Sequence, residues 1–191
     1  VPAPLAVGEE HGISGKDYIL SVAVACEVIL RFGRAAGYSA VVERGFHETS
    51  VEGPLGAAAG VGKLLGIGED KLLNAISIAG SHASGTLEYA QTGGDVKRLH
   101  AGIGAVGGIR SALLAQRGLT GPPTILEGKR GLFQAFANTY DASKVIEGLG
   151  EAYELLGTEF KRYCAGVLQT EIDGVREIMT KNHLKPEDIE E

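Results

Sequence analysis

Apolar residues recur along the chain mostly at helical spacing. Residues 17–33 are apolar nearly all round, which is typical of a helix buried on most of its faces. Ser14 and Asp17 stand where a capping residue and a first-turn acid are expected. Residues 69–80 and 169–182 place apolar side chains about one helical turn apart, as an amphipathic helix does. The pattern therefore predicts a mainly helical chain.

Two further segments are expected to be helices made largely of small residues. The first begins at Pro54, a residue that suits the first turn of a helix, and reads PLGAAAGVGKLLG. The second covers residues 101–117 and contains Gly102, Gly104 and Gly107. An interior glycine costs a helix about 1 kcal/mol relative to alanine, so neither segment would be stable alone. We therefore expect both to be held by close packing of backbone against backbone.

The stretches between these helices carry more polar residues. Residues 38–53 are expected to be a loop, and residues 80–100 a polar stretch containing glycine. Residues 141–156 have a helical pattern, whereas residues 158–168 become strand-like or irregular. We therefore expect a helical domain to end near residue 145 and a different layer to begin there.

Charge and cysteine content exclude several classes of function. Lys plus Arg number 18 and Asp plus Glu 24, and a net charge of −6 without a basic stripe argues against binding nucleic acid or anionic membranes. The two cysteines, Cys26 and Cys164, form no CxxC pair and are too few for a cysteine-held iron–sulfur cluster or a four-cysteine zinc site. The acidic and histidine residues have no clear metal-ligand spacing either, so we expect no metal and no cofactor. Reduced thiols and the absence of a long apolar run or signal peptide favour a cytoplasmic protein.

Two groups of residues could carry chemistry. Lys97, Arg98 and His100 immediately precede the helix expected from Ala101, where free N–H groups and added positive charge could bind a carboxylate or phosphate. The alternative is an exposed basic turn. His47 lies in the polar sequence GFHETS and could act as a general acid or base, or could simply pack in a loop.

The spacing of Gly102, Gly104 and Gly107 also matches the G-x-G-x-x-G pattern of dinucleotide-binding loops. Such a site requires a buried strand immediately before the glycines. The preceding residues, DVKRLHA, are too polar for that strand. The pattern therefore favours a helix face made small for close packing over a nucleotide site.

Four long blocks of the sequence resemble the MmgE/PrpD family. They read SGKDYILSVAVACEVILRFGRAAG, RGFHETSVEGPLGAAAGVGKLLGI, LLNAISIAGSHASGTLEYAQTGGDVKRLHAG and LTGPPTILEGKRGLF. The resemblance implies a large all-helical domain, here partial over residues 1–145, followed by the start of a smaller α+β lid domain over residues 146–191. It also implies an active site between the two domains, a homodimer, and no iron–sulfur cluster. Because family members extend beyond both ends of this sequence, we expect it to be a piece of a longer protein.

The resemblance assigns roles to individual residues. His47 matches the histidine of the family's GFH motif, and Lys97 matches the lysine of its KRLH motif, with His100 beside it. These three are the expected catalytic residues. Arg98 and Lys161 are expected to hold substrate carboxylates, the latter from the start of the lid. Gln169 stands near the place where family members usually have a histidine.

The function that the resemblance implies is a lyase reaction on a small polycarboxylate. The first expectation is dehydration of a tricarboxylate such as 2-methylcitrate, as in propionate catabolism, by removal of a proton next to a carboxylate. Epimerisation and decarboxylation share much of this chemistry and remain alternatives within the family. A truncated helical module without catalytic activity is the alternative from another class.

Overall fold

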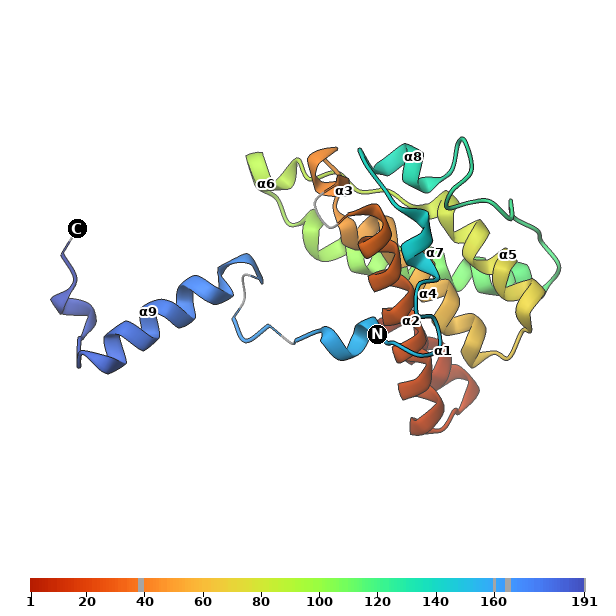
Figure 1. Cartoon of the computed structure of the whole chain (residues 1–191). Coiled ribbons are helices and arrows are strands. Elements are labelled where there is room, and N and C mark those ends of the chain that lie inside the picture. The colour runs from red at the N-terminus through yellow and green to blue at the C-terminus, as the bar shows by residue number, and fades with distance from the viewer. Residues whose placement is uncertain (38–39, 160, 164–165, 191) are drawn as a thin grey trace. The chain divides into compact units, whose positions relative to one another are not determined.

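The protein is mainly helical and forms two compact units, Val1–Leu156 and Gly157–Glu191. The computed structural model describes residues 1–37, 40–159, 161–163 and 166–190. The first unit is built on the helices α1 (Pro2–His11), α2 (Gly15–Ala36), α3 (Ala40–Glu43), α4 (Glu48–Leu64), α5 (Glu69–Ala79), α6 (Tyr89–Thr92), α7 (Val96–Gln116) and α8 (Leu132–Phe136) (Figure 1). None of the helices in the described residues combines the length and apolar character needed to cross a lipid bilayer.

Helix α2 confirms the helix predicted near the start of the chain and extends it at both ends. Ile19 and Leu20 are exposed, so the expected burial on most faces is not found in its first turns. The Ser14 hydroxyl accepts a hydrogen bond from the Asp17 N–H at 3.1 Å and so caps the first turn. Phe32 on the buried face of α2 stacks on Phe133 of α8, with ring centroids 4.9 Å apart. Cys26 is a free, half-buried thiol in this helix, and Cys164 lies outside the described residues.

Helix α4 lies at the centre of the first unit and packs against α1, α2, α5 and α7. Its approach to α7 requires glycine on α7. A Cβ added at Gly104 would lie 3.3 Å from the Cα of Gly53, and one added at Gly108 would lie 2.3 Å from the Cβ of Ala57. The predicted backbone-to-backbone packing is therefore present. The glycines at 102, 104 and 107 lie inside α7 and not in a phosphate-binding loop before it.

The prediction that residues 38–53 form a loop and that Pro54 begins a helix was wrong. Helix α4 starts at Glu48 and contains Pro54 in its interior. Proline has no N–H, so the Ser50 carbonyl, four residues earlier, loses its donor within the helix. The Ser84 N–H donates to this carbonyl at 3.3 Å. The proline therefore provides an attachment point for the segment of residues 83–87, which we call the strap.

Helix α7 (Val96–Gln116) also starts earlier than predicted. This helix begins at Val96, five residues before the expected Ala101, so the basic residues stand in its first turns and not in a loop before it. Gly93 and Gly94 adopt φ values of +89° and +119°, which end the preceding turn of helix. Polarity alone suggested a loop here, but the glycine pair determines where the helix can begin.

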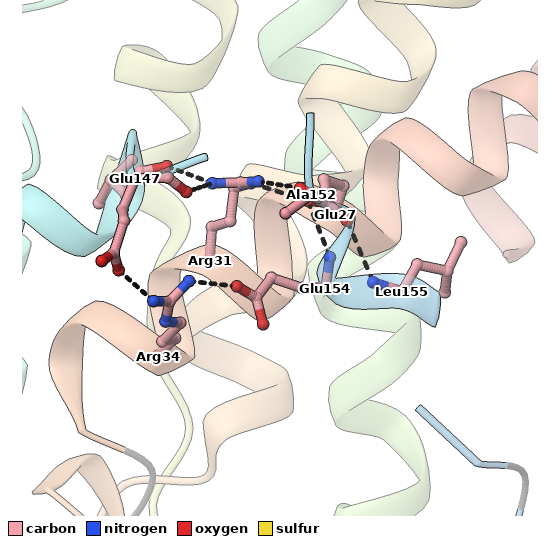
Figure 2. Close-up of polar contacts among 8 residues, drawn as sticks. Glu27, Arg31, Arg34, Glu147, Ala152, Glu154 and Leu155 are labelled. Atoms are coloured by element: carbon pink, nitrogen blue, oxygen red, sulfur yellow. Dashed lines mark hydrogen bonds and ion pairs between the residues drawn. The ribbon is translucent and has the colours of Figure 1, made fainter. Parts of the chain in front are cut away.

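Residues 141–156 do not form the predicted helix. The segment contains short 3₁₀ turns, Ala142–Val145 and Glu154–Gly157, because its backbone polar groups bind α2. The buried Arg31 guanidinium donates to three carbonyl oxygens, those of Val145, Glu147 and Ala152, at 3.1, 2.9 and 2.7 Å. Figure 2 shows this group of contacts, which we call the Arg31 clamp.

The acidic partner of the Arg31 clamp is Glu27. Its carboxylate accepts hydrogen bonds from the N–H groups of Glu154 and Leu155 and pairs with Arg31 at 2.7 Å (Figure 2). Those N–H contacts and the Arg31 pairing hold the pKa of Glu27 below its usual range, despite the opposing effect of burial. Arg34, on the same helix, forms ion pairs with the side chains of Glu147 and Glu154.

The second unit contains the amphipathic helix predicted near the end of the chain, α9 (Gln169–Lys181), and short 3₁₀ turns at Gly166–Leu168 and Pro186–Asp188. The Tyr163 hydroxyl donates to Asp173 of this helix at 2.8 Å. The described residues of this unit include no strand. That residues 146–191 begin an α+β lid domain stays a prediction.

Candidate active site

The backbone around His47 is held by an antiparallel pairing with the strap. Phe46 and Thr86 form an isolated β-bridge, the His47 N–H donates to the Gly85 carbonyl at 3.0 Å, and the Leu87 N–H donates to the Gly45 carbonyl at 2.8 Å. His47 then occupies the N-cap position of α4. Its imidazole is therefore positioned by a helix end on one side and a paired segment on the other.

His47 and His100 form a direct pair. The two Nδ1 atoms are 2.8 Å apart, although the residues are separated by 53 positions in the sequence. His100 projects from the second turn of α7 and is only 3% exposed. At this distance one Nδ1 donates and the other accepts, so the pair shares a single proton between its Nδ1 atoms. Its protonation behaviour belongs to both rings together.

Gly85 of the strap closes one side of this pair. Its φ of +88° is a conformation that glycine adopts readily. A Cβ added there would lie 2.5 Å from the buried Ser50 hydroxyl oxygen and 3.2 Å from Cε1 of His100. The position therefore requires glycine for both conformation and space.

The electrostatic surroundings favour a neutral His47. Burial lowers the pKa of this imidazole, and the nearby positive charges of His100 and Lys97 lower it further. A neutral imidazole at physiological pH can accept a proton, and its conjugate acid is a correspondingly stronger donor. Both properties suit proton transfer to and from carbon.

Tyr89 of α6 completes the group and was not predicted from the sequence. Its ring centroid lies 5.6 Å from that of His47 and 5.7 Å from that of His100, both in edge-on geometry. The Lys97 Nζ lies 5.8 Å from the centroid of the same ring. One sequence feature could have drawn attention to this residue, since Tyr89 is the only Phe, Tyr or Trp among residues 80–100. We call His47, His100, Tyr89 and Lys97 the imidazole cluster.

Two carboxyl groups on α4 have raised pKa values and were also missed. Glu52 is 8% exposed, and its side chain lies against Gly33 of α2. Burial and the neighbouring charge of Glu48 raise the pKa of Glu52 to about 8, so its carboxyl group is mostly protonated at neutral pH. Burial also raises the pKa of Glu48. Spacing alone gave no reason to expect a buried, uncharged glutamate.

The remaining predicted residues have the following surroundings in the described part of the chain. Arg98 is exposed and forms a long ion pair with Asp95 at 3.7 Å. Lys161 belongs to the second unit and is exposed. Gln169 supports its own unit, where its side-chain oxygen accepts the Arg162 N–H at 2.8 Å. Carboxylate binding by Arg98 and Lys161 stays a prediction, as do the roles of the cluster residues.

The family to which the chain belongs follows from comparison with known protein families. The MmgE/PrpD N-terminal domain matches residues 1–144. The chain belongs to the MmgE/PrpD family. That match covers the imidazole cluster and every long helix of the first unit. It ends close to the expected domain boundary at residue 145, whereas the compact first unit continues to Leu156.

Curated relatives of this MmgE/PrpD chain include cis-aconitate decarboxylases. The enzyme from Aspergillus terreus (strain NIH 2624 / FGSC A1156) is 31% identical over 194 residues, which cover 95% of this chain and 39% of the relative. The Homo sapiens enzyme is 37% identical over 155 residues, covering 80% of this chain and 31% of the relative. The Mus musculus enzyme is 36% identical over 125 residues. The chain thus spans about two fifths of the Aspergillus relative's length.

Proposed function

We propose that the imidazole cluster forms the proton-transfer part of an active site for small polycarboxylates, with decarboxylation of cis-aconitate as the reaction. The observation that carries the proposal is the 2.8 Å contact between the Nδ1 atoms of His47 and His100. A shared proton between two imidazoles, next to a lysine, suits transfer of a proton to a carbanion formed beside carboxylates. The names of the curated relatives support cis-aconitate as the substrate.

The proposed reaction places a distinct demand on each group. The bond between carbon and the departing carboxylate breaks, carbon dioxide leaves, and the electron pair stays on the substrate as a delocalised carbanion. The protonated imidazole pair then gives its proton to carbon and returns to the neutral state. Lys97 binds a remaining carboxylate through its ammonium group and stabilises the negative charge that persists through the transition state.

Dehydration, the first expectation from the sequence, is the second candidate reaction. It is supported by the lowered pKa of His47, which favours the neutral imidazole that dehydration requires. In that reaction the neutral pair first removes a proton next to a carboxylate, and water then leaves. The two chemistries require opposite proton states of the same pair. Decarboxylation should therefore weaken as pH rises through the pKa of the pair, whereas dehydration should strengthen.

Proton NMR of the full chain in D2O, with cis-aconitate, citrate and 2-methylcitrate added in turn, tests this proposal. We expect loss of the cis-aconitate signals, incorporation of deuterium at carbon and release of carbon dioxide. Turnover of citrate or 2-methylcitrate with loss of water would instead establish dehydratase activity. Unchanged signals for all three compounds, together with unshifted imidazole resonances, would overturn the assignment of a polycarboxylate site.

A matched pair of variants assigns the chemistry to the cluster. His47→Gln and His100→Gln each remove the shared proton but keep a polar side chain of similar reach. We expect either change to lower kcat/KM by roughly a hundredfold or more, as loss of a general acid or base does. His11→Gln, on an exposed histidine of α1, is the control and should leave kcat/KM unchanged. Full activity in both cluster variants would refute the mechanism.

A further inference from the structure

Tyr89 contacts every other member of the imidazole cluster. Its ring packs edge-on with the imidazoles of His47 and His100, at centroid distances of 5.6 and 5.7 Å. The Lys97 ammonium lies 5.8 Å from the centroid of the same ring. The ring is therefore close to both the flexible lysine and the histidine pair. Neither the family match nor the relatives' names assign this residue a role.

The fold holds Tyr89 in place through the strap. The hydrogen bonds from Leu87 to Gly45 and from His47 to Gly85 fix the strap beside His47, and α6 starts two residues after Leu87. The strap is fixed a second time by the Ser50 carbonyl that Pro54 leaves without an internal donor. Tyr89 and His47 are thus attached to the same small framework of backbone hydrogen bonds.

Lys97, by contrast, has little to hold it. It is exposed, its four-carbon side chain is flexible, and it forms no ion pair with a carboxylate in the described part of the chain. Attraction of an ammonium group to an aromatic face is the interaction available to it here. Without the ring, the ammonium could occupy many positions in solvent, and its distance from the imidazoles would not be defined.

We propose that Tyr89 is a positioning residue whose ring fixes the Lys97 ammonium next to the His47–His100 pair. The inference rests on the proposed function for its consequence, since a fixed ammonium aligns a substrate carboxylate with the proton donor. The ring carries this role and the hydroxyl group does not. Burial and the charge of the Glu48 carboxyl on α4 raise the pKa of the Tyr89 hydroxyl.

A double-mutant cycle on the substrate-free protein tests the positioning directly. The probe is the pKa of His47, followed by NMR of the imidazole Cε1–H as pH is varied. Lys97→Met should raise this pKa, because a positive charge that opposes protonation is removed. If Tyr89 holds the ammonium in place, Lys97→Met should have almost no effect in a Tyr89→Leu background. Tyr89→Phe should preserve the full effect of Lys97→Met.

A control separates positioning from a general loss of packing. Tyr140 stacks on Phe133 at 5.1 Å, so Tyr140→Leu removes a comparable aromatic contact from the same unit. The effect of Lys97→Met on the pKa of His47 should persist in that background. Persistence of the effect in Tyr89→Leu, or its loss in Tyr140→Leu, would overturn the proposal.

Kinetics with cis-aconitate then test the consequence separately. We expect Tyr89→Leu to raise KM roughly three- to fivefold, which is the size expected for loss of a partly exposed cation–π contact. Loss of coupling in the NMR cycle without turnover of any polycarboxylate would refute the proposed function and leave the positioning of Lys97 established. Intact coupling in an active enzyme would refute the positioning alone.

Discussion

The Glu52→Gln substitution is expected to stabilise the first unit at neutral pH. Glu52 is 8% exposed, and its pKa is raised from 4.5 to about 8 by burial and by Glu48. Because the folded state binds this proton more tightly than the unfolded state, the folded state loses stability as pH rises from about 4.5 to about 8. Glutamine has nearly the same shape and does not ionise, so the variant lacks this loss.

The magnitude follows from the size of the pKa difference. Each unit of pH between the two pKa values costs about 1.4 kcal/mol, so the cost is about 1 kcal/mol at pH 5 and about 4 kcal/mol at pH 8. The free energy of unfolding of the wild type should therefore fall by about 3 kcal/mol across this range through Glu52 alone. His47 works in the opposite direction, since its pKa is lowered on folding. The difference between wild type and variant isolates the contribution of Glu52.

Urea unfolding at pH 5, 6, 7 and 8, followed by far-ultraviolet circular dichroism, measures this difference. The stability of Glu52→Gln relative to wild type should grow steadily with pH. Glu10→Gln, on an exposed glutamate of α1, is the matched control and should follow the wild type at every pH. Parallel loss of stability in wild type and Glu52→Gln would show that Glu52 ionises normally and would refute the reasoning.

Two further predictions concern packing and the Arg31 clamp, and both are checked by urea unfolding at pH 7. Gly108→Ala should lower the free energy of unfolding by about 3 kcal/mol, because the added Cβ would lie 2.3 Å from that of Ala57. Gly102→Ala on the same helix meets nothing within 4 Å and should instead raise stability by up to about 1 kcal/mol, so equal effects would contradict the packing argument. Arg31→Met should lower the free energy of unfolding by about 3–5 kcal/mol. The Glu27 carboxylate is nearly buried, and this substitution removes its charged partner. The double variant with Glu27→Gln should recover part of that loss, and no recovery would argue against an unpaired charge as the cause.

The helical class was predictable because apolar spacing reports which faces are buried. The Ser14 cap of α2, the amphipathic pattern of α9 and the close-packed glycines of α7 all follow from local rules. Residues 141–156 were predicted wrongly because their conformation depends on Arg31, more than a hundred positions earlier in the sequence. Local pattern carries no information about such a distant donor.

The candidate site shows the same division between local and distant information. His47 and Lys97 were found through short motifs, and the importance of His100 came only from its place beside Lys97. Tyr89 and Glu52 were missed because their significance depends on neighbours that the fold supplies, a histidine pair in one case and burial against Gly33 in the other. Interior Pro54 was misread because the donor that compensates for it, the Ser84 N–H, is 30 positions away.

The Arg31 clamp has a consequence for how this region can change through evolution. Arg31 recognises carbonyl oxygens of Val145, Glu147 and Ala152, groups that every amino acid possesses. Side chains in the clamped segment can therefore be exchanged while its path is preserved, provided that the arginine and the turns remain. We expect related proteins to keep Arg31 and Glu27 on α2 while the side chains of the clamped segment diverge. A sequence alignment alone would therefore understate how well the path of that segment is preserved.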